Sequence, residues 1–70
     1  MIESSECKEF LFRRVGVGLP HLSDSTKIFY YYGTLLSVTT EYVKIKMRNG
    51  YKQIPLEEII EIKLAEEAQL

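Results

Sequence analysis

The chain has 70 residues and a formal net charge of −1, with nine Lys or Arg against ten Asp or Glu. This length makes one domain, over residues 1–70, close to the lower limit at which a single core offsets chain entropy without a metal, a disulfide or a partner subunit. A single cysteine excludes an intramolecular disulfide, no Cys/His spacing predicts a metal site, and no apolar run approaches the roughly 20 residues of a membrane span. We therefore expect a cytoplasmic protein without cofactor, metal or membrane contact that gains stability by forming a homo-oligomer.

Charge is unevenly distributed along the chain. Residues 1–52 hold eight basic and five acidic residues, a net of +3, whereas residues 53–70 hold one lysine and five glutamates, a net of −4. A basic surface with an acidic C-terminal end is one interpretation, and ordinary solvation of exposed faces is the other.

The N-terminal segment predicts a short helix over about residues 4–11. Ser4 or Ser5 can cap its first turn. Its apolar residues recur at i, i+3 and i+4, the spacing of one helical stripe, and these are Cys7, Phe10 and Leu11. We expect this stripe to cover the core.

The next segment, residues 11–19, alternates as a β-strand does. Gly16 and Gly18 leave one face of this strand without side chains, so another backbone or an aromatic ring can approach closely there. Residues 20–26 form a loop, because Pro20 lacks a donor and the following Ser, Asp and Thr side chains favour local turns.

A long β-forming run over residues 27–39 predicts the second strand, and Gly33 inside it predicts a bend or a bulge. Three consecutive tyrosines place rings on both faces of this strand, so the inward rings belong to the core. Exposed neighbouring rings often mark interfaces. We expect an oligomer interface here, with base stacking, a peptide groove or simple surface exposure as alternatives; the residues are Tyr30, Tyr31 and Tyr32.

Residues 42–48 alternate between apolar and basic side chains, and Asn49-Gly50 follows directly. This pattern predicts a β-hairpin with a type I′ turn at Asn49-Gly50, because both central residues of that turn need positive φ. Basic groups neutralise phosphates and rings stack on bases. The candidate nucleic-acid-binding residues are therefore Lys44, Lys46, Arg48, Lys52 and Tyr51. The alternative is a solvated strand face whose lysines block aggregation at a sheet edge.

Pro55 ends the fourth strand, and residues 56–59 fit one 3₁₀ turn. Residues 60–64 then alternate as a closing strand, and residues 65–70 form a polar tail. Five short, bent strands after one helix favour a mostly β fold, a small five-stranded bent barrel over about residues 12–64, because closure removes exposed sheet edges.

No catalytic arrangement emerges from the sequence, so we expect a protein that is not an enzyme. His21 and Asp24 share one loop, but no nucleophile stands at a diagnostic spacing from them. Cys7 is expected to be a small buried apolar group rather than a reactive thiol.

Three segments together resemble the Sm-like (LSm) family of small β-barrels. Residues 10–17 (FLFRRVGV) resemble its short helix and the basic pair before the first strand. Residues 32–38 (YGTLLSV) resemble its bent second strand with a central glycine, and residues 50–62 resemble its last two strands. The resemblance implies an Sm-like barrel whose subunits pair strands edge to edge into a homo-oligomer and bind RNA.

The chain departs from this family at the residues that contact RNA. Thr39, Glu41 and Val43 stand where the family has an acid, an aromatic and an asparagine, and no arginine-glycine pair precedes the final strand. The family's uridine pocket is therefore expected to be missing. We expect a divergent member that binds RNA or another nucleic acid through basic and tyrosine side chains; the alternative is a protein–protein interaction module on an SH3-like barrel with no nucleic-acid role.

Overall fold

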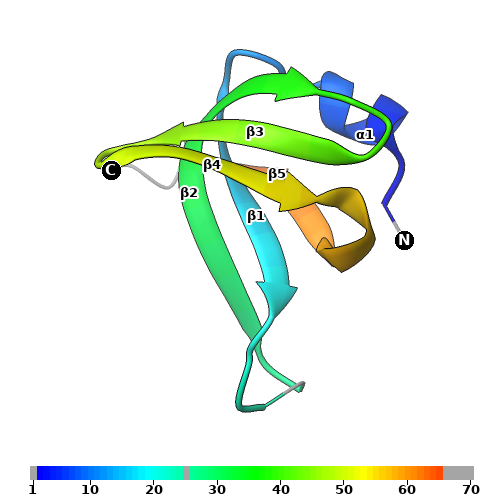
Figure 1. Cartoon of the computed structure of the whole chain (residues 1–70), viewed down its shortest axis with the longest axis vertical. Helices are drawn as coiled ribbons and strands as arrows, with labels where there is room; N and C mark the ends of the chain where they lie inside the picture. Colours follow the sequence, from blue (N-terminus) through cyan, green and yellow to red (C-terminus); the bar gives the residue numbers. More distant parts are fainter. Residues whose placement is uncertain (1, 25, 66–70) are drawn as a thin grey trace.

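The structure, a computed structural model, describes residues 2–24 and 26–65. In chain order its elements are α1 (Ser4–Lys8), β1 (Arg14–Pro20), β2 (Ile28–Val38), β3 (Tyr42–Met47), β4 (Gly50–Pro55), the 3₁₀ helix η1 (Leu56–Glu58) and β5 (Glu61–Leu64). The strands form one antiparallel sheet in the order β4-β3-β2-β1-β5 (Figure 1). The predicted mostly β fold with five strands and one short helix is confirmed. Within the described ranges β4 and β5 are the two ends of that order, so the sheet is not closed into a barrel by hydrogen bonds.

The concave face of the sheet holds the core. Alternation in β3 turns Val43 and Ile45 inward, where both are fully buried, and leaves Lys44 and Lys46 on the outer face, as the sequence predicts. Burial of each such side chain contributes about 1.5–3 kcal/mol. The buried core residues are Cys7, Val15, Val17, Leu35, Val43, Ile45, Ile54, Leu56 and Ile59. Hereafter, the inner face is the side of the sheet that faces this core, and the outer face is the other side.

Helix α1 is shorter than the predicted residues 4–11. It ends at Lys8, because the Phe10 N–H donates to the Cys7 carbonyl at 2.9 Å and tightens the chain into turns. The predicted serine cap is wrong: Glu3 precedes the helix, and its side chain makes no capping bond. The apolar stripe is confirmed nonetheless, since Cys7 is buried and both Phe10 and Leu11 pack against the core.

Strand β2 curves so that it belongs to two parts of the sheet (Figure 1). It pairs with β1 from Ile28 to Thr34, but with β3 only from Thr34 onward. The bulge that accompanies this curvature lies between Leu35 and Ser37 rather than at Gly33. Gly33 has a different role: a Cβ there would lie 2.5 Å from the Lys46 carbonyl oxygen, so only glycine lets β3 approach this closely.

The β3–β4 hairpin is confirmed, but its predicted turn is wrong. Met47 pairs with Gly50, so the two loop residues are Arg48 and Asn49. Asn49 does not have a positive φ, whereas Gly50 has φ 140°. Glycine is needed as the first residue of β4 rather than as the second residue of a type I′ turn.

The C-terminal elements follow the predicted order. The 3₁₀ turn after Pro55 is confirmed as η1, and β5 begins at Glu61. The tail was expected from residue 65, but Ala65 is buried and its N–H donates to the Arg14 carbonyl at 3.0 Å. The rest of the expected tail, residues 66–70, lies outside the described residues. In the described part of the chain no helix is long and apolar enough to cross a membrane.

Candidate functional site

A row of polar side chains crosses the outer face of the sheet. Arg14 of β1 pairs with Thr34 of β2, Thr34 pairs with Lys46 of β3, and Lys46 pairs with Tyr51 of β4. Directly opposed residues on neighbouring strands share one face, so these four side chains form one line across four strands. Arg14, Lys46 and Tyr51 are exposed, so the row brings two cations and a ring to solvent. We call these four residues the cationic row.

Two tyrosine rings lie beside the cationic row on the same outer face. Tyr32 pairs with Gly16 and Tyr30 pairs with Gly18. A Cβ on Gly16 would stand 2.8 Å from Cε1 of Tyr32, and one on Gly18 would stand 3.0 Å from Cε1 of Tyr30. The predicted close approach of aromatic rings over these glycines is therefore confirmed. The two rings stack at an interplanar angle of 29°, with centroids 6.0 Å apart.

Tyr30 is held in place by β5, whereas Tyr32 is not. The Tyr30 hydroxyl donates to the Glu61 carboxylate, and the Lys63 ammonium lies 4.3 Å from the Tyr30 ring centroid. The hydrogen bond to Glu61, helped by desolvation, raises the pKa of Tyr30 above its ordinary value. Tyr32 remains 41% exposed, so its ring is the one available to a ligand.

The hairpin residues predicted from the sequence divide between the two faces. Lys44 and Lys46 lie on the outer face, with the Lys44 ammonium 5.2 Å from the Tyr51 ring centroid. Lys52 is directly opposite the buried Ile45 and lies 4.6 Å from the ring centroid of Tyr31, on the inner face. The structure therefore brings together Lys44, Lys46 and Tyr51 and separates Lys52 from them.

The three tyrosines predicted as an interface divide in the same way. Tyr31 packs against the core, and its ring meets Phe29 edge to face at 4.8 Å. Tyr30 and Tyr32 are on the outer face. Only these two can contact a partner from that side.

A basic depression opens where β2 is unpaired with β3, next to the hairpin tip. It has a volume of about 830 Å³. Among the residues that the structure describes, its charged lining residues are Arg14, Lys46 and Arg48, and no carboxylate lines it. Three cations near one another concentrate anionic ligands because their fields add. The remaining lining residues are Phe29, Tyr30, Tyr31, Tyr32, Thr34, Met47 and Asn49.

Arg14 is the residue of this surface that sequence reasoning missed. The basic pair Arg13-Arg14 was visible in the sequence, but only as part of a family resemblance. What joins Arg14 to Lys46 is the strand register through Thr34, and alternation along each strand does not determine which residues lie opposite each other.

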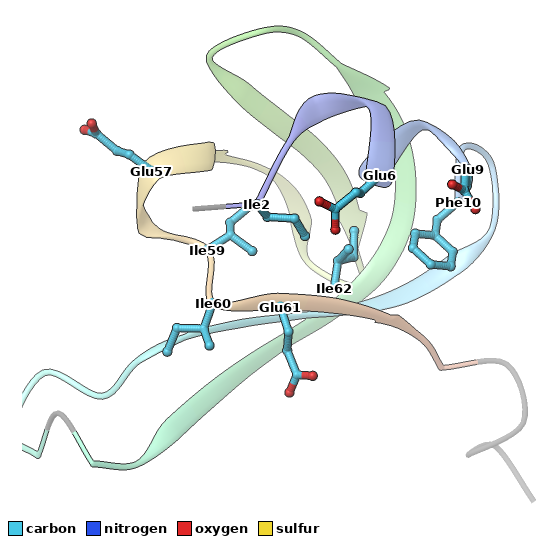
Figure 2. A pocket seen from close by; sticks show the side chains of 9 residues that line it. All are labelled: Ile2, Glu6, Glu9, Phe10, Glu57, Ile59, Ile60, Glu61 and Ile62. Carbon is cyan, nitrogen blue, oxygen red and sulfur yellow. The ribbon is translucent and has the colours of Figure 1, made fainter.

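A hollow between α1 and β5 has the opposite character. Figure 2 shows Ile2, Phe10, Ile59 and Ile62 directed into the space between the helix and the strand. Its volume is about 740 Å³. In the described part of the chain four carboxylates and no cation line it; the carboxylates are Glu6, Glu9, Glu57 and Glu61. Glu61 points away from α1 in Figure 2, toward the outer face where it accepts the bond from Tyr30. We call this region the acidic hollow.

The other residue types that can carry chemistry are cysteine, histidine and aspartate, and here they are buried or hydrogen-bonded within their own loop. The Cys7 thiol is buried, and desolvation, with a smaller effect of Glu6, raises the pKa of this thiol. His21 Nδ1 accepts from the Ser23 N–H at 3.2 Å, and Asp24 accepts from the Thr26 hydroxyl and N–H, which lowers the pKa of Asp24. Within residues 2–24 and 26–65 no His, Cys, Asp and Glu side chains gather as a metal-binding group.

The three positions at which the sequence departs from the Sm-like pattern lie in the β2–β3 turn and in β3. Val43 is fully buried. The Thr39 hydroxyl accepts from the N–H groups of Glu41 and Tyr42, at 3.1 and 3.0 Å, and so closes the β2–β3 turn. Comparison of the chain with protein-family models, with curated proteins and with solved structures finds no match.

Proposed function

We propose that this protein is a non-enzymatic, cytoplasmic protein that binds RNA, with its basic outer face as the contact surface. The observation that carries the proposal is the cationic row, together with a depression lined, within residues 2–24 and 26–65, by three cations and no carboxylate. Lys and Arg neutralise phosphates, and exposed rings such as Tyr32 and Tyr51 stack on bases. Arg14 joins the predicted residues Lys44, Lys46, Arg48 and Tyr51 in this role, and Lys52 is left out of it.

We also propose that the sheet forms a small barrel of the Sm-like or SH3-like kind. Three features support this: the strand order β4-β3-β2-β1-β5, the curved β2 shared between two parts of the sheet, and η1 between β4 and β5. The concave face already encloses the core cluster.

The free edges support assembly into a homo-oligomer. Leu56 N–H donates to the Glu41 carbonyl, and hydrogen-bonded pairs alternate along an antiparallel ladder. The backbone groups of Tyr51 and Gln53 therefore point away from β3. By the same reasoning, the bond between Ala65 and Arg14 means that the backbone groups of Ile62 and Leu64 point away from β1.

These two edges also complement each other in charge. β4 belongs to the hairpin that carries Lys44, Lys46 and Arg48, whereas β5 borders the acidic hollow. Pairing β4 of one copy with β5 of the next would bring opposite charges together. The expected result is an oligomer in solution, measured by light scattering coupled to size-exclusion chromatography; a monomer at every concentration would contradict it.

The test of RNA binding is the salt dependence of affinity for a short single-stranded RNA, measured by fluorescence anisotropy. Three phosphate contacts predict a slope of about −2 in log K against log salt. The Arg14→Glu/Lys46→Glu double variant is expected to lose binding. Lys8→Glu is the matched control, because Lys8 is an exposed cation on α1. Undetectable binding of the unmodified protein at low salt would reject the function.

A second candidate function is a protein interaction module. The observation that favours it is an apolar groove of about 730 Å³ between the end of the β1–β2 hairpin and β4. His21, Phe29 and Tyr31 meet edge to face along it. A specific partner protein that remains bound after nuclease treatment, and is lost with Phe29→Ser, would favour this function over RNA binding.

A further inference from the structure

Phe12 has two properties that do not stabilise the folded state. Among the described residues it is the one non-glycine residue with a positive φ, 67°. Its side chain is also 75% exposed. A bulky residue in the left-handed region is sterically disfavoured. An exposed ring gains little free energy from burial, so burial does not offset this steric cost.

The hydrogen bonds identify the position as one that favours glycine. The Phe12 N–H donates to the Leu35 carbonyl at 2.7 Å, and the Leu35 N–H donates to the Arg13 carbonyl at 3.0 Å. Phe12 and Arg13 thus stand opposite the single residue Leu35, which is a β-bulge with its first residue in the left-handed region. Glycine is the usual first residue of this bulge.

The bulge lies at the end of the cationic row. Arg14, the first residue of β1 and the first member of the row, follows Phe12 by two residues. The Phe12 backbone is therefore within about 7 Å of the backbone of the first cation of the row, and its exposed ring is within reach of a polyanion bound there. A ligand with both phosphates and aromatic bases complements that combination.

We infer that Phe12 is a base-stacking residue for single-stranded RNA whose phosphates lie along the cationic row. This inference rests on the proposed function and adds a specific contact to it. The bases of a duplex are already stacked on each other, so a ring at the surface gains a partner only from an unpaired base. The protein is therefore expected to prefer single-stranded over double-stranded RNA.

The decisive variant is Phe12→Gly, because it is expected to weaken RNA binding without lowering the stability of the fold. Glycine adopts the left-handed conformation freely, so the thermal unfolding midpoint is expected not to fall. Loss of one stacked ring is expected to weaken affinity for a single-stranded RNA by roughly 5- to 150-fold. The salt slope is expected to stay unchanged, since no phosphate contact is removed.

Two further variants make the test specific. Phe12→Trp keeps an aromatic face and is expected to retain affinity. Leu22→Gly removes another exposed apolar side chain, at the remote β1–β2 loop, and is expected to leave affinity unchanged. Each measurement uses the whole chain and the same single-stranded RNA, with a matched RNA duplex as the competitor ligand.

The outcomes separate this inference from the function on which it rests. If the unmodified protein binds with salt dependence but Phe12→Gly binds equally well, Phe12 is not a stacking residue while the proposed function stands. If Phe12→Gly instead lowers the unfolding midpoint together with affinity, the ring serves the fold and the inference is overturned. A reduced solution mass with unchanged RNA affinity would also overturn it, because Phe12 would then be a subunit contact.

Discussion

The basic outer face and the acidic hollow differ in charge although they belong to one small domain. Arg14, Lys46 and Arg48 line the depression on the basic side, whereas the charged groups that line the hollow between α1 and β5 are, among the described residues, all carboxylates. The net charge of the whole chain is −1, a value that describes neither region. Distribution rather than total charge therefore decides which ligands each side attracts.

The two regions can act separately because solvent ions screen one from the other. The domain extends 31 × 30 × 21 Å, and the screening length is about 8 Å at physiological ionic strength. Charges more than a screening length apart therefore contribute little to each other's local potential. Glu61 is the exception, because it accepts the hydrogen bond of Tyr30 at the border of the two regions. A polyanion at the basic face would meet little repulsion from the more distant carboxylates of the hollow.

The largest expected effect comes from Gly33→Ala, which displaces the strand that carries the lysines of the basic side. The new Cβ would meet the Lys46 carbonyl oxygen, a backbone atom that cannot swing away. Displacement of β3 is expected to destabilise the protein by about 1–3 kcal/mol, and it would also break the cationic row.

The measurement for Gly33→Ala is the thermal unfolding midpoint together with RNA affinity. Gly16→Ala is the control, because its new Cβ meets the side chain of Tyr32, which can move. Equal midpoints for the two variants would show that the close approach of β3 is not what requires glycine.

An intermediate effect is expected from neutralising one lysine of the hairpin. Lys46→Gln removes a cation from the basic face and is expected to lower RNA affinity several-fold and the magnitude of the salt slope by about 0.7. Lys52→Gln removes the same charge from the inner face and is expected to change the slope little. Equal losses would mean that the two faces do not act separately.

The smallest effect concerns the hydrogen bond at the border of the two regions. Tyr30 donates to Glu61, which raises the pKa of Tyr30 above the value in the unfolded chain. The stability from this bond is fully present below the ordinary tyrosine pKa and is lost as pH rises through the folded-state pKa. Tyr30→Phe is therefore expected to lose less stability than the unmodified protein between neutral and strongly alkaline pH.

Urea unfolding across this pH range measures the difference. Tyr51→Phe is the control, because among the described residues the Tyr51 hydroxyl makes no hydrogen bond and its ring contacts Lys44. The same alkaline loss in Tyr30→Phe and in the unmodified protein would contradict the role assigned to this bond.

Much of the fold could be predicted because local patterns dictate it. Alternation gave the inward Val43 and Ile45, and Gly16 and Gly18 gave the positions that rings cover. The turn at Arg48 and Asn49 could not be predicted in the same way, because an Asn-Gly pair fits more than one hairpin geometry and the pairing of Met47 with Gly50 selects among them.

The candidate site was harder to predict than the fold. Charge and ring content marked the hairpin, but the sequence does not say which strand ends beside it. Arg14 belongs to the site because the pairing of β1 with β2, and of β2 with β3, sets it in line with Lys46. Lys52 does not belong to it, because its pairing with Ile45 places it on the inner face. Phe12 was not visible at all, because a left-handed residue leaves no signal in the sequence unless it is glycine or asparagine.

The exposed turn at the hairpin tip also bears on the chemical lifetime of the basic face. Asn49 is followed by Gly50, which has no side chain and nothing within 4 Å of the place where a Cβ would stand. No side chain of residue 50 therefore shields its amide nitrogen, which can attack the asparagine side-chain carbonyl and release ammonia through a cyclic imide. Hydrolysis of that imide leaves a carboxylate beside Arg48, so a stored sample is expected to accumulate an acidic form with weakened RNA binding, separable by ion exchange. Age, and not only sequence, would then determine the charge of this surface.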